Sequence, residues 1–246
     1  MYLSEVFEQL FFGELSQTAI GKHVADPTQM DPIHYPKMIN YINLGVLELH
    51  KKFELLESEV VIQQYTGLTD YYLKYDFAIT NPAVPGEPIR YIVDSVDEPF
   101  TTNRPLRVLS LTNEAGQEYT LNPSFTVPSL ELTPTLIAYT PSQLHLQIPY
   151  PNDANAVFAI CQAAPNNIPT NNTTPTTTEV EIPDILLGPL LIFIAERYFI
   201  VMAGDKEENR IYPSKFDKAC KDIDKNNLIN KSQIQGNNRF WMNGWV

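Results

Sequence analysis

The chain has 246 residues, of which 43% are hydrophobic and 19% are charged, so it can bury the core of one large domain or two small ones. Its net charge of −12 argues against a protein that grips nucleic acid through phosphate contacts, because such binding needs clustered Lys and Arg side chains. Twenty prolines against ten glycines predict many rigid loop segments.

The charge is unevenly distributed along the chain. Residues 1–56 carry a net charge of −3, residues 57–182 carry −10 and residues 183–246 carry +1. The acidic middle of the chain is therefore expected to be a structural unit separate from its two ends.

The N-terminal residues predict a short amphipathic helix. Ser4 is a candidate N-cap, and the apolar residues Val6, Phe7, Leu10 and Phe11 lie on one helical face. Gly13 interrupts this pattern, and residues 23–36 are expected to form a loop.

The stretch from Tyr35 to Leu56 predicts the helix around which the chain is organised. Pro36 suits the first helical turn, where a missing N–H costs nothing. The residues of one buried stripe recur at steps of three and four: Ile39, Ile42, Val46, Leu49 and Phe53. Leu44, Leu47 and Leu55 form a second, flanking stripe, so the helix is expected to pack on two sides.

Three polar or small residues of this helix carry further expectations. Gly45 costs up to about 1 kcal/mol relative to Ala in a helix interior, so it is either a weak point or a place where another backbone comes close. Glu48 and Lys52 are spaced for an i,i+4 ion pair on the solvent side.

From residue 57 the apolar pattern changes from helical to alternating, which predicts β-strands. The first two strands are expected near Val60 and over Leu73 to Phe77, paired as a hairpin. Residues 89–96 form either a strand or a short helical turn. Further strands are expected at residues 107–112, 117–121, 144–148, 156–161 and 178–182, with a four-residue turn at 113–116. The pattern predicts a small antiparallel sandwich.

Helical periodicity returns at Asp184, with a stripe formed by Leu187, Leu191, Ile194, Tyr198 and Val201. Pro189 either bends this helix or marks its start. A last helix is expected to open at Pro213, where Ser214 and Asp217 resemble a capping box.

The predicted fold class is therefore α+β. Residues 1–56 and 183–232 are expected to form one helical domain, with residues 57–182 inserted between them as an antiparallel β-sandwich-like domain. Residues 233–246 are expected to form an extended C-terminal arm, and residues 165–177 an exposed polar loop.

The sequence shows no catalytic constellation. His23 and Asp26 lack partner ligands at a recognisable spacing. The densest acidic cluster, formed by Asp94, Asp97 and Glu98, would suit a Ca²⁺ loop or a carboxylate pair for glycoside cleavage, but it lacks the glycine and ligand series of an EF-hand. We therefore expect no catalytic residue, no cofactor and no metal site.

Cysteine usage and hydropathy indicate a protein of the cell interior. Cys161 and Cys220 have neither zinc spacing nor partners for a disulfide framework, so both are expected to be reduced and structural. The N-terminus lacks the basic residues of a secretory signal. The longest apolar run, residues 185–195, is shorter than the roughly 20 residues that a membrane span needs, so no membrane association is expected.

The last eight residues carry the clearest binding signal. They contain both tryptophans of the chain, Trp241 and Trp245, together with Arg239, Phe240 and Val246. Trp and Arg dominate binding hot spots because they bury a large area and keep a polar handle. This arm either packs on its own core or reaches onto a neighbouring subunit, and the polar residues before it favour the second interpretation.

Three segments resemble one known family. They are the N-terminal LSEVFEQLFFGELSQ, the helix-plus-strand segment INYINLGVLELHKKFELLESEVVI, and the ending NRFWMNGWV after a Lys-rich helix. In this order they resemble the head-to-tail adaptor proteins of short-tailed bacteriophages, the group related to tail tubular protein A and also called ring or head-completion proteins. The resemblance transfers no catalytic residues and no cofactor.

The resemblance implies a structural virion protein, not an enzyme. Twelve copies would form a ring, assembled in the host cytoplasm, that joins the portal to the tail and forms part of the DNA channel. The implied partners are other copies of the chain, the portal protein, the downstream tail or nozzle proteins, and double-stranded DNA that passes without sequence-specific binding. Arg239 to Val246 would dock on the portal or on an adjacent subunit.

Two other functions stay open from the sequence. The first is another tail or baseplate connector that uses the β domain as a binding module. The second is a wall-degrading hydrolase that uses the carboxylates Asp94 and Asp97.

Overall fold

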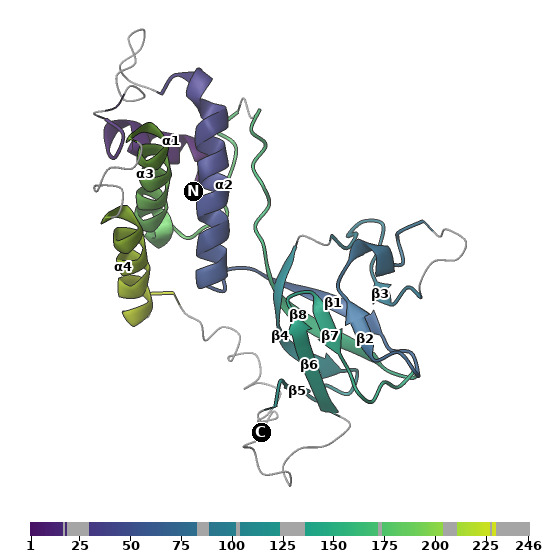
Figure 1. Cartoon of the computed structure of the whole chain (residues 1–246). Helices are drawn as coiled ribbons and strands as arrows, with labels where there is room; N and C mark the ends of the chain where they lie inside the picture. The colour runs from purple at the N-terminus through teal and green to yellow at the C-terminus, as the bar shows by residue number, and fades with distance from the viewer. Residues whose placement is uncertain are drawn as a thin grey trace, which may run out of the picture. The chain divides into compact units, whose positions relative to one another are not determined.

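The computed structural model describes residues 1–16, 18, 30–82, 89–101, 104–123, 136–171, 174–203, 211–226 and 228–229. Its internal contacts divide the chain into two compact units, Met1–Glu54 with Pro165–Val246, and Leu55–Ala164. The first unit contains the helices and the second contains the strands (Figure 1). This mixed arrangement confirms the predicted α+β class, while the predicted arm over residues 233–246 lies outside the described residues.

Helix α1 spans Leu3–Phe12 and buries one apolar face, formed by Leu3, Val6, Phe7, Leu10 and Phe11. Its N-cap is Tyr2 rather than the predicted Ser4. The N–H of Tyr2 donates to Oε2 of Glu5, 2.7 Å away, which satisfies a backbone donor that the helix leaves unpaired at its start.

Helix α2 spans Tyr35–Lys52 and follows a 3₁₀ turn over Pro32–His34. The predicted main stripe is confirmed, because all five of its residues are buried, including Phe53 just past the helix end. The predicted second stripe is wrong at Leu44, which is 49% exposed. Glu48 also pairs with Lys51, not with Lys52 as predicted, at 2.8 Å.

The partner of Lys52 lies on the last helix. Helix α4 spans Ile211–Lys225, so it starts before the predicted Pro213 and leaves Ser214 inside the helix. Asp217 Oδ1 accepts a hydrogen bond from Lys52 Nζ at 2.5 Å, while the side chain of Ser214 lies outside the described residues. The Lys52 ammonium also lies 5.0 Å from the ring centroid of Phe216, so it joins the end of α2 to α4.

Helix α3 spans Leu187–Ala203 after a 3₁₀ turn over Asp184–Leu186, and it contacts each of the other three helices. Pro189 lies in its first turn, where the missing N–H is tolerated. Of the predicted stripe, Ile194 and Tyr198 are buried, whereas Leu187 and Leu191 are partly exposed and the side chain of Val201 lies outside the described residues. Leu190 and Phe193, which lie off the predicted stripe, are also buried, so a single stripe does not describe α3.

Gly45 lies in the contact between α2 and α3. A Cβ atom at this position would lie 2.6 Å from Leu190 Cδ1 and 3.0 Å from Phe193 Cδ1. The glycine therefore allows side chains of α3 to pack directly against the α2 backbone. A close approach is one of the two expectations for this residue, but side chains of α3, and not its backbone, make it.

The second unit is a sandwich of two four-stranded sheets (Figure 1). One sheet has the order β3-β1-β8-β4 and the other β2-β7-β6-β5. The strands are β1 Glu57–Gln63, β2 Asp70–Tyr72, β3 Ile92–Val93, β4 Pro105–Asn113, β5 Thr120–Leu121, β6 Ile137–Ser142, β7 His145–Gln147 and β8 Ala156–Ala163. Both sheets contribute to one core that includes Ile62, Tyr71, Leu111 and Leu146. All pairings are antiparallel except that of β5 with β6.

The first predicted hairpin does not form. β1 pairs with β3 and β8, whereas β2 belongs to the other sheet and pairs with β7. The residues Tyr75–Phe77, predicted as a strand, form a 3₁₀ turn. The predicted turn at residues 113–116 is confirmed, because the Asn113 N–H donates to Gln117 O at 3.0 Å and Gly116 adopts a φ of 75°.

Residues 165–182 belong by their contacts to the helical unit. Asn43 of α2 holds the backbone of Ile168 by two hydrogen bonds, of 2.8 and 3.0 Å, and Ile168 is buried. The Leu3 N–H donates to Thr178 O, and the Val180 N–H donates to Met1 O. The predicted strand at residues 178–182 therefore reduces to a single bridge between Tyr2 and Glu179, beside α1.

None of the described helices has the length and apolar character needed to cross a bilayer.

Substitution of Gly45 tests the contact between α2 and α3. Gly45→Val should lower the free energy of unfolding by about 1–3 kcal/mol, because the added atoms collide with Leu190 and Phe193. Leu44→Val, one residue earlier and exposed, is the matched control and should cost well below about 1 kcal/mol from helix propensity. Urea unfolding followed by circular dichroism measures both, and equal losses would contradict the close approach.

Candidate interaction surfaces

In the acidic cluster at residues 94–98, Asp94 connects two loop segments by hydrogen bonds. The Asp94 carboxylate accepts hydrogen bonds from the Thr80 N–H at 2.9 Å, from the Thr80 hydroxyl, and from the Phe100 N–H at 2.9 Å. Burial acts to raise the pKa of Asp94, but these hydrogen bonds outweigh it and hold the pKa below its ordinary value. Asp97 and Glu98 are exposed. Among the described residues, no group of three His, Cys, Asp or Glu side chains could hold a metal ion.

Two histidines, His50 and His145, have structural surroundings. His145 Nε2 lies 2.8 Å from Asp70 Oδ1, and its ring stacks on Tyr72 with centroids 4.5 Å apart. His50 is buried, with Nε2 2.8 Å from the Glu181 carbonyl oxygen. His23 and Asp26 lie outside the described residues.

Both cysteines are free thiols and both are buried. Burial raises the pKa of Cys161 to about 12 and that of Cys220 to about 11. Because the thiolate is the reactive form, these are structural residues and not nucleophiles, as the sequence predicts.

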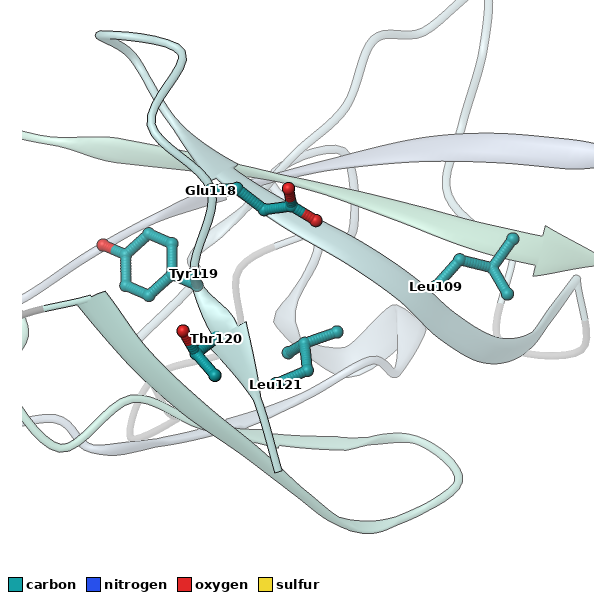
Figure 2. Close-up of a pocket in the computed structure, with 5 residues that line it drawn as sticks. All are labelled: Leu109, Glu118, Tyr119, Thr120 and Leu121. Carbon is teal, nitrogen blue, oxygen red and sulfur yellow. The ribbon is translucent and has the colours of Figure 1, made fainter. Parts of the chain in front are cut away.

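The β unit has an open hollow of about 310 Å³ beside β4 and β5, lined by Leu109, Glu118, Tyr119, Thr120 and Leu121. Figure 2 shows the Glu118 carboxylate and Leu121 on the side of Leu109, while the Tyr119 ring points the other way. The Tyr119 hydroxyl accepts a hydrogen bond from Gln64 Nε2 at 3.3 Å, so this tyrosine is part of the core of the β unit. Two leucines and one carboxylate do not make a set of convergent polar groups for a small molecule.

An apolar rim surrounds the edge strand β3. Its members, Ile79, Ile89, Val93 and Val96, are 51%, 54%, 42% and 88% exposed. The Ile79 N–H donates to Ile92 O, and Val93 is the register partner of Val61, so the rim is attached to one end of the four-stranded sheet. We call these four residues the β3 rim. Exposed apolar side chains on neighbouring segments of an edge strand favour a role in protein–protein contact.

The helical unit has a basic–aromatic cluster, which we define as Lys37, Tyr41, Arg197 and Tyr198. The Lys37 ammonium lies 5.9 Å from the ring centroid of Tyr41 on α2 and 5.3 Å from that of Tyr198 on α3. Burial and Tyr198 raise the pKa of Tyr41, whereas the Arg197 guanidinium acts to lower it. Arg197 is therefore close enough to Tyr41 to interact with it electrostatically. The Arg197 guanidinium itself lies 5.1 Å from the Phe193 ring centroid.

A second helical surface has the opposite charge. The exposed residues Glu5, Glu8, Gln9 and Phe12 follow one another at helical spacing along α1, and we call them the α1 stripe. Residues 1–16 contain three glutamates and neither lysine nor arginine. Phe12 is 57% exposed.

The predicted arm residues Arg239, Phe240, Trp241, Trp245 and Val246 lie outside the described residues, so their role stays a prediction. Sequence patterns did not indicate the basic–aromatic cluster, because Lys37 and Tyr198 are brought together only by the packing of α2 on α3. The only local signal was the i,i+4 spacing of Lys37 and Tyr41. The β3 rim was likewise not identified, because its apolar residues resemble those of a buried strand.

Taken together, these surfaces define a class of protein that works by contacts with other proteins. A comparison with protein families finds that the model of the SU10 adaptor protein family matches residues 12–239, which is most of the chain. The chain belongs to this family, a family of phage head-to-tail adaptors. A comparison with curated proteins gives no match.

Family membership confirms the predicted resemblance. It assigns the chain a structural, non-enzymatic role as a phage adaptor, which binds other virion proteins and has its place in the virion.

Substitution of the acidic cluster separates a structural from a catalytic role. Asp94→Ala should lower the free energy of unfolding by about 1.5–3 kcal/mol, because donors that face a carboxylate lose their acceptor. Asp97→Ala, at an exposed position of the same cluster, should change it by less than about 0.5 kcal/mol. Thermal unfolding measures both, and wall-degrading activity that vanishes in Asp97→Ala would contradict the structural role.

Glu196 on α3 gives a prediction on pH dependence, since it is the buried carboxylate of the described residues and only 8% exposed. Burial raises its pKa, with Asp217 adding to the effect and Arg197 opposing it. The folded state therefore holds this proton more tightly than the unfolded state, and the corresponding stability is lost as the pH rises through the folded-state pKa.

Glu196→Gln should accordingly raise the thermal midpoint at pH 7, and the difference from the native chain should shrink as the pH falls towards 4. Calorimetry at several pH values measures the difference, with the exposed Glu14→Gln as control. A gain that is independent of pH would show that packing, and not ionisation, is responsible.

Proposed function

We propose that this chain is the subunit of a ring that joins the portal to the tail and forms part of the DNA channel. The observation that carries the proposal is the family match over residues 12–239, which includes the inserted β unit and the greater part of both segments of the helical unit. Twelve copies complete the ring in this proposal.

Each part of the chain has a separate task in the proposed ring. The helical unit forms contacts from subunit to subunit. The inserted β unit, Leu55–Ala164, faces the next tail component, and the exposed β3 rim supports a protein-binding role for it. The arm, Arg239 to Val246, binds the portal or a neighbouring subunit through its Trp and Arg side chains.

The charge of the chain suits a channel for DNA. A net charge of −12 on each copy, multiplied around a ring, repels phosphate groups. Double-stranded DNA then passes without sequence-specific binding, because few cations are available to neutralise its backbone.

Mass measurement on the purified chain, alone and mixed with purified portal rings, tests this proposal. A stoichiometric ring, formed alone or on the portal, is the expected result. A chain that stays monomeric and has no affinity for portal rings would contradict it.

The β3 rim also favours a second candidate, a different connector of the tail or baseplate that uses the β unit as its binding module. The same experiment separates the two, because such a connector would bind tail components and leave the portal unbound.

Deletion of residues 239–246 tests the proposed arm. We expect the thermal midpoint of the truncated chain to stay within a few degrees of the full chain, while ring or portal attachment falls at least tenfold, because the hot-spot side chains are lost. A variant with a Gly/Ser sequence of equal length in their place controls for chain length. Normal assembly of the truncated chain would show that the arm is not the attachment site.

A further inference from the structure

We propose that the basic–aromatic cluster of one copy binds the α1 stripe of a second copy, and that this contact links neighbouring subunits. The inference rests on the proposed function, because it identifies the surfaces through which the helical unit would meet its neighbour. It concerns residues of the helical unit alone.

The two cations of the cluster form no ion pair with a carboxylate of the described residues. Within the described part of the chain, the ion pairs on α2 use Lys51 and Lys52, whereas neither Lys37 nor Arg197 takes part in one. Both are nevertheless held against aromatic rings, Lys37 against Tyr41 and Tyr198 and Arg197 against Phe193. Side chains that are already positioned lose less conformational entropy on binding.

The α1 stripe supplies the complementary charge. Glu5 and Glu8 lie on it with no base on the same helix, and Glu14 follows just after the helix end. Opposite potentials on two surfaces accelerate their encounter and fix the register in which they meet.

Each surface also has an exposed apolar side chain beside its charges. Leu44, three residues after Tyr41 on α2, is 49% exposed, and Phe12 at the end of the α1 stripe is 57% exposed. A charged contact beside an apolar one is the usual composition of an interface with a buried centre and a polar rim.

The two patches are different and complementary, so one copy can present its basic–aromatic cluster to the α1 stripe of the next. Repeated around an axis, this head-to-tail contact generates a closed ring when the rotation between neighbours closes. A two-fold dimer that pairs Lys37 of each copy with Glu8 of the other would use the same charges, and its mass distinguishes it from a ring. A second copy is therefore the occupant that the charges favour.

A charge exchange tests the contact directly. Lys37→Glu and Glu8→Lys should each weaken assembly at least tenfold, and the chain that carries both should return to within threefold of the native chain, because the pair is restored with its signs exchanged. Lys218→Glu, an exposed residue of α4 with the same change of charge, is the matched control and should assemble normally.

Sedimentation velocity, alone and with portal rings, measures assembly, and circular dichroism confirms that each variant is folded. Native assembly by both single variants, or no recovery in the double variant, would overturn the inference. Loss of portal binding in Lys37→Glu that Glu8→Lys does not repair would identify the portal, and not a second copy, as the occupant. A native chain that never assembles would contradict the proposed function itself, which is a different outcome.

Discussion

The structure of the helical unit depends on the packing of α3 against α2 at Gly45. The two helices meet where a Cβ atom would collide with Leu190 and Phe193, so the absence of a side chain permits the contact. α3 covers part of the buried stripe of α2 and of the apolar face of α1, because it contacts each of the other three described helices. The N-terminal helices therefore form a complete domain only together with the C-terminal part of the chain.

That return is made possible by the way in which the β unit begins and ends. Its first and last strands, β1 and β8, are paired along their whole length, from Glu57 with Gln162 to Gln63 with Ala156. The Ala163 N–H donates to Leu56 O at 2.8 Å, so the inserted unit leaves close to where it entered. Once the sandwich has folded, the loop that separates α2 from residue 165 is effectively short, and the entropy needed to close it is small. Insertion of a domain whose ends lie together is tolerated for this reason.

Polar side chains in this protein hold segments together and leave charged surfaces for partners. Asp94 fastens the loop after β3, Asn43 holds the Ile168 backbone, and Lys52 joins α2 to α4. The thiols of Cys161 and Cys220, a group that is reactive when exposed as a thiolate, are buried here and contribute to packing. This use of polar groups agrees with the structural role that the adaptor family implies.

The sequence by itself determined the succession of helices, strands and helices along the chain, the α+β class and the family. Local signals were sufficient for these, because helical periodicity identified the Ile39 to Phe53 stripe and the four-residue turn at residues 113–116 has its own chemistry. The tertiary structure alone decided the pairing of β1 with β8, the attachment of residues 165–182 to the helices, and the exposure of Leu44. It also decided that Lys52 meets Asp217 and that Lys37 meets Tyr198. These contacts join residues that are far apart in the chain, and no local pattern encodes which distant partner a strand edge, a cation or an apolar stripe will find.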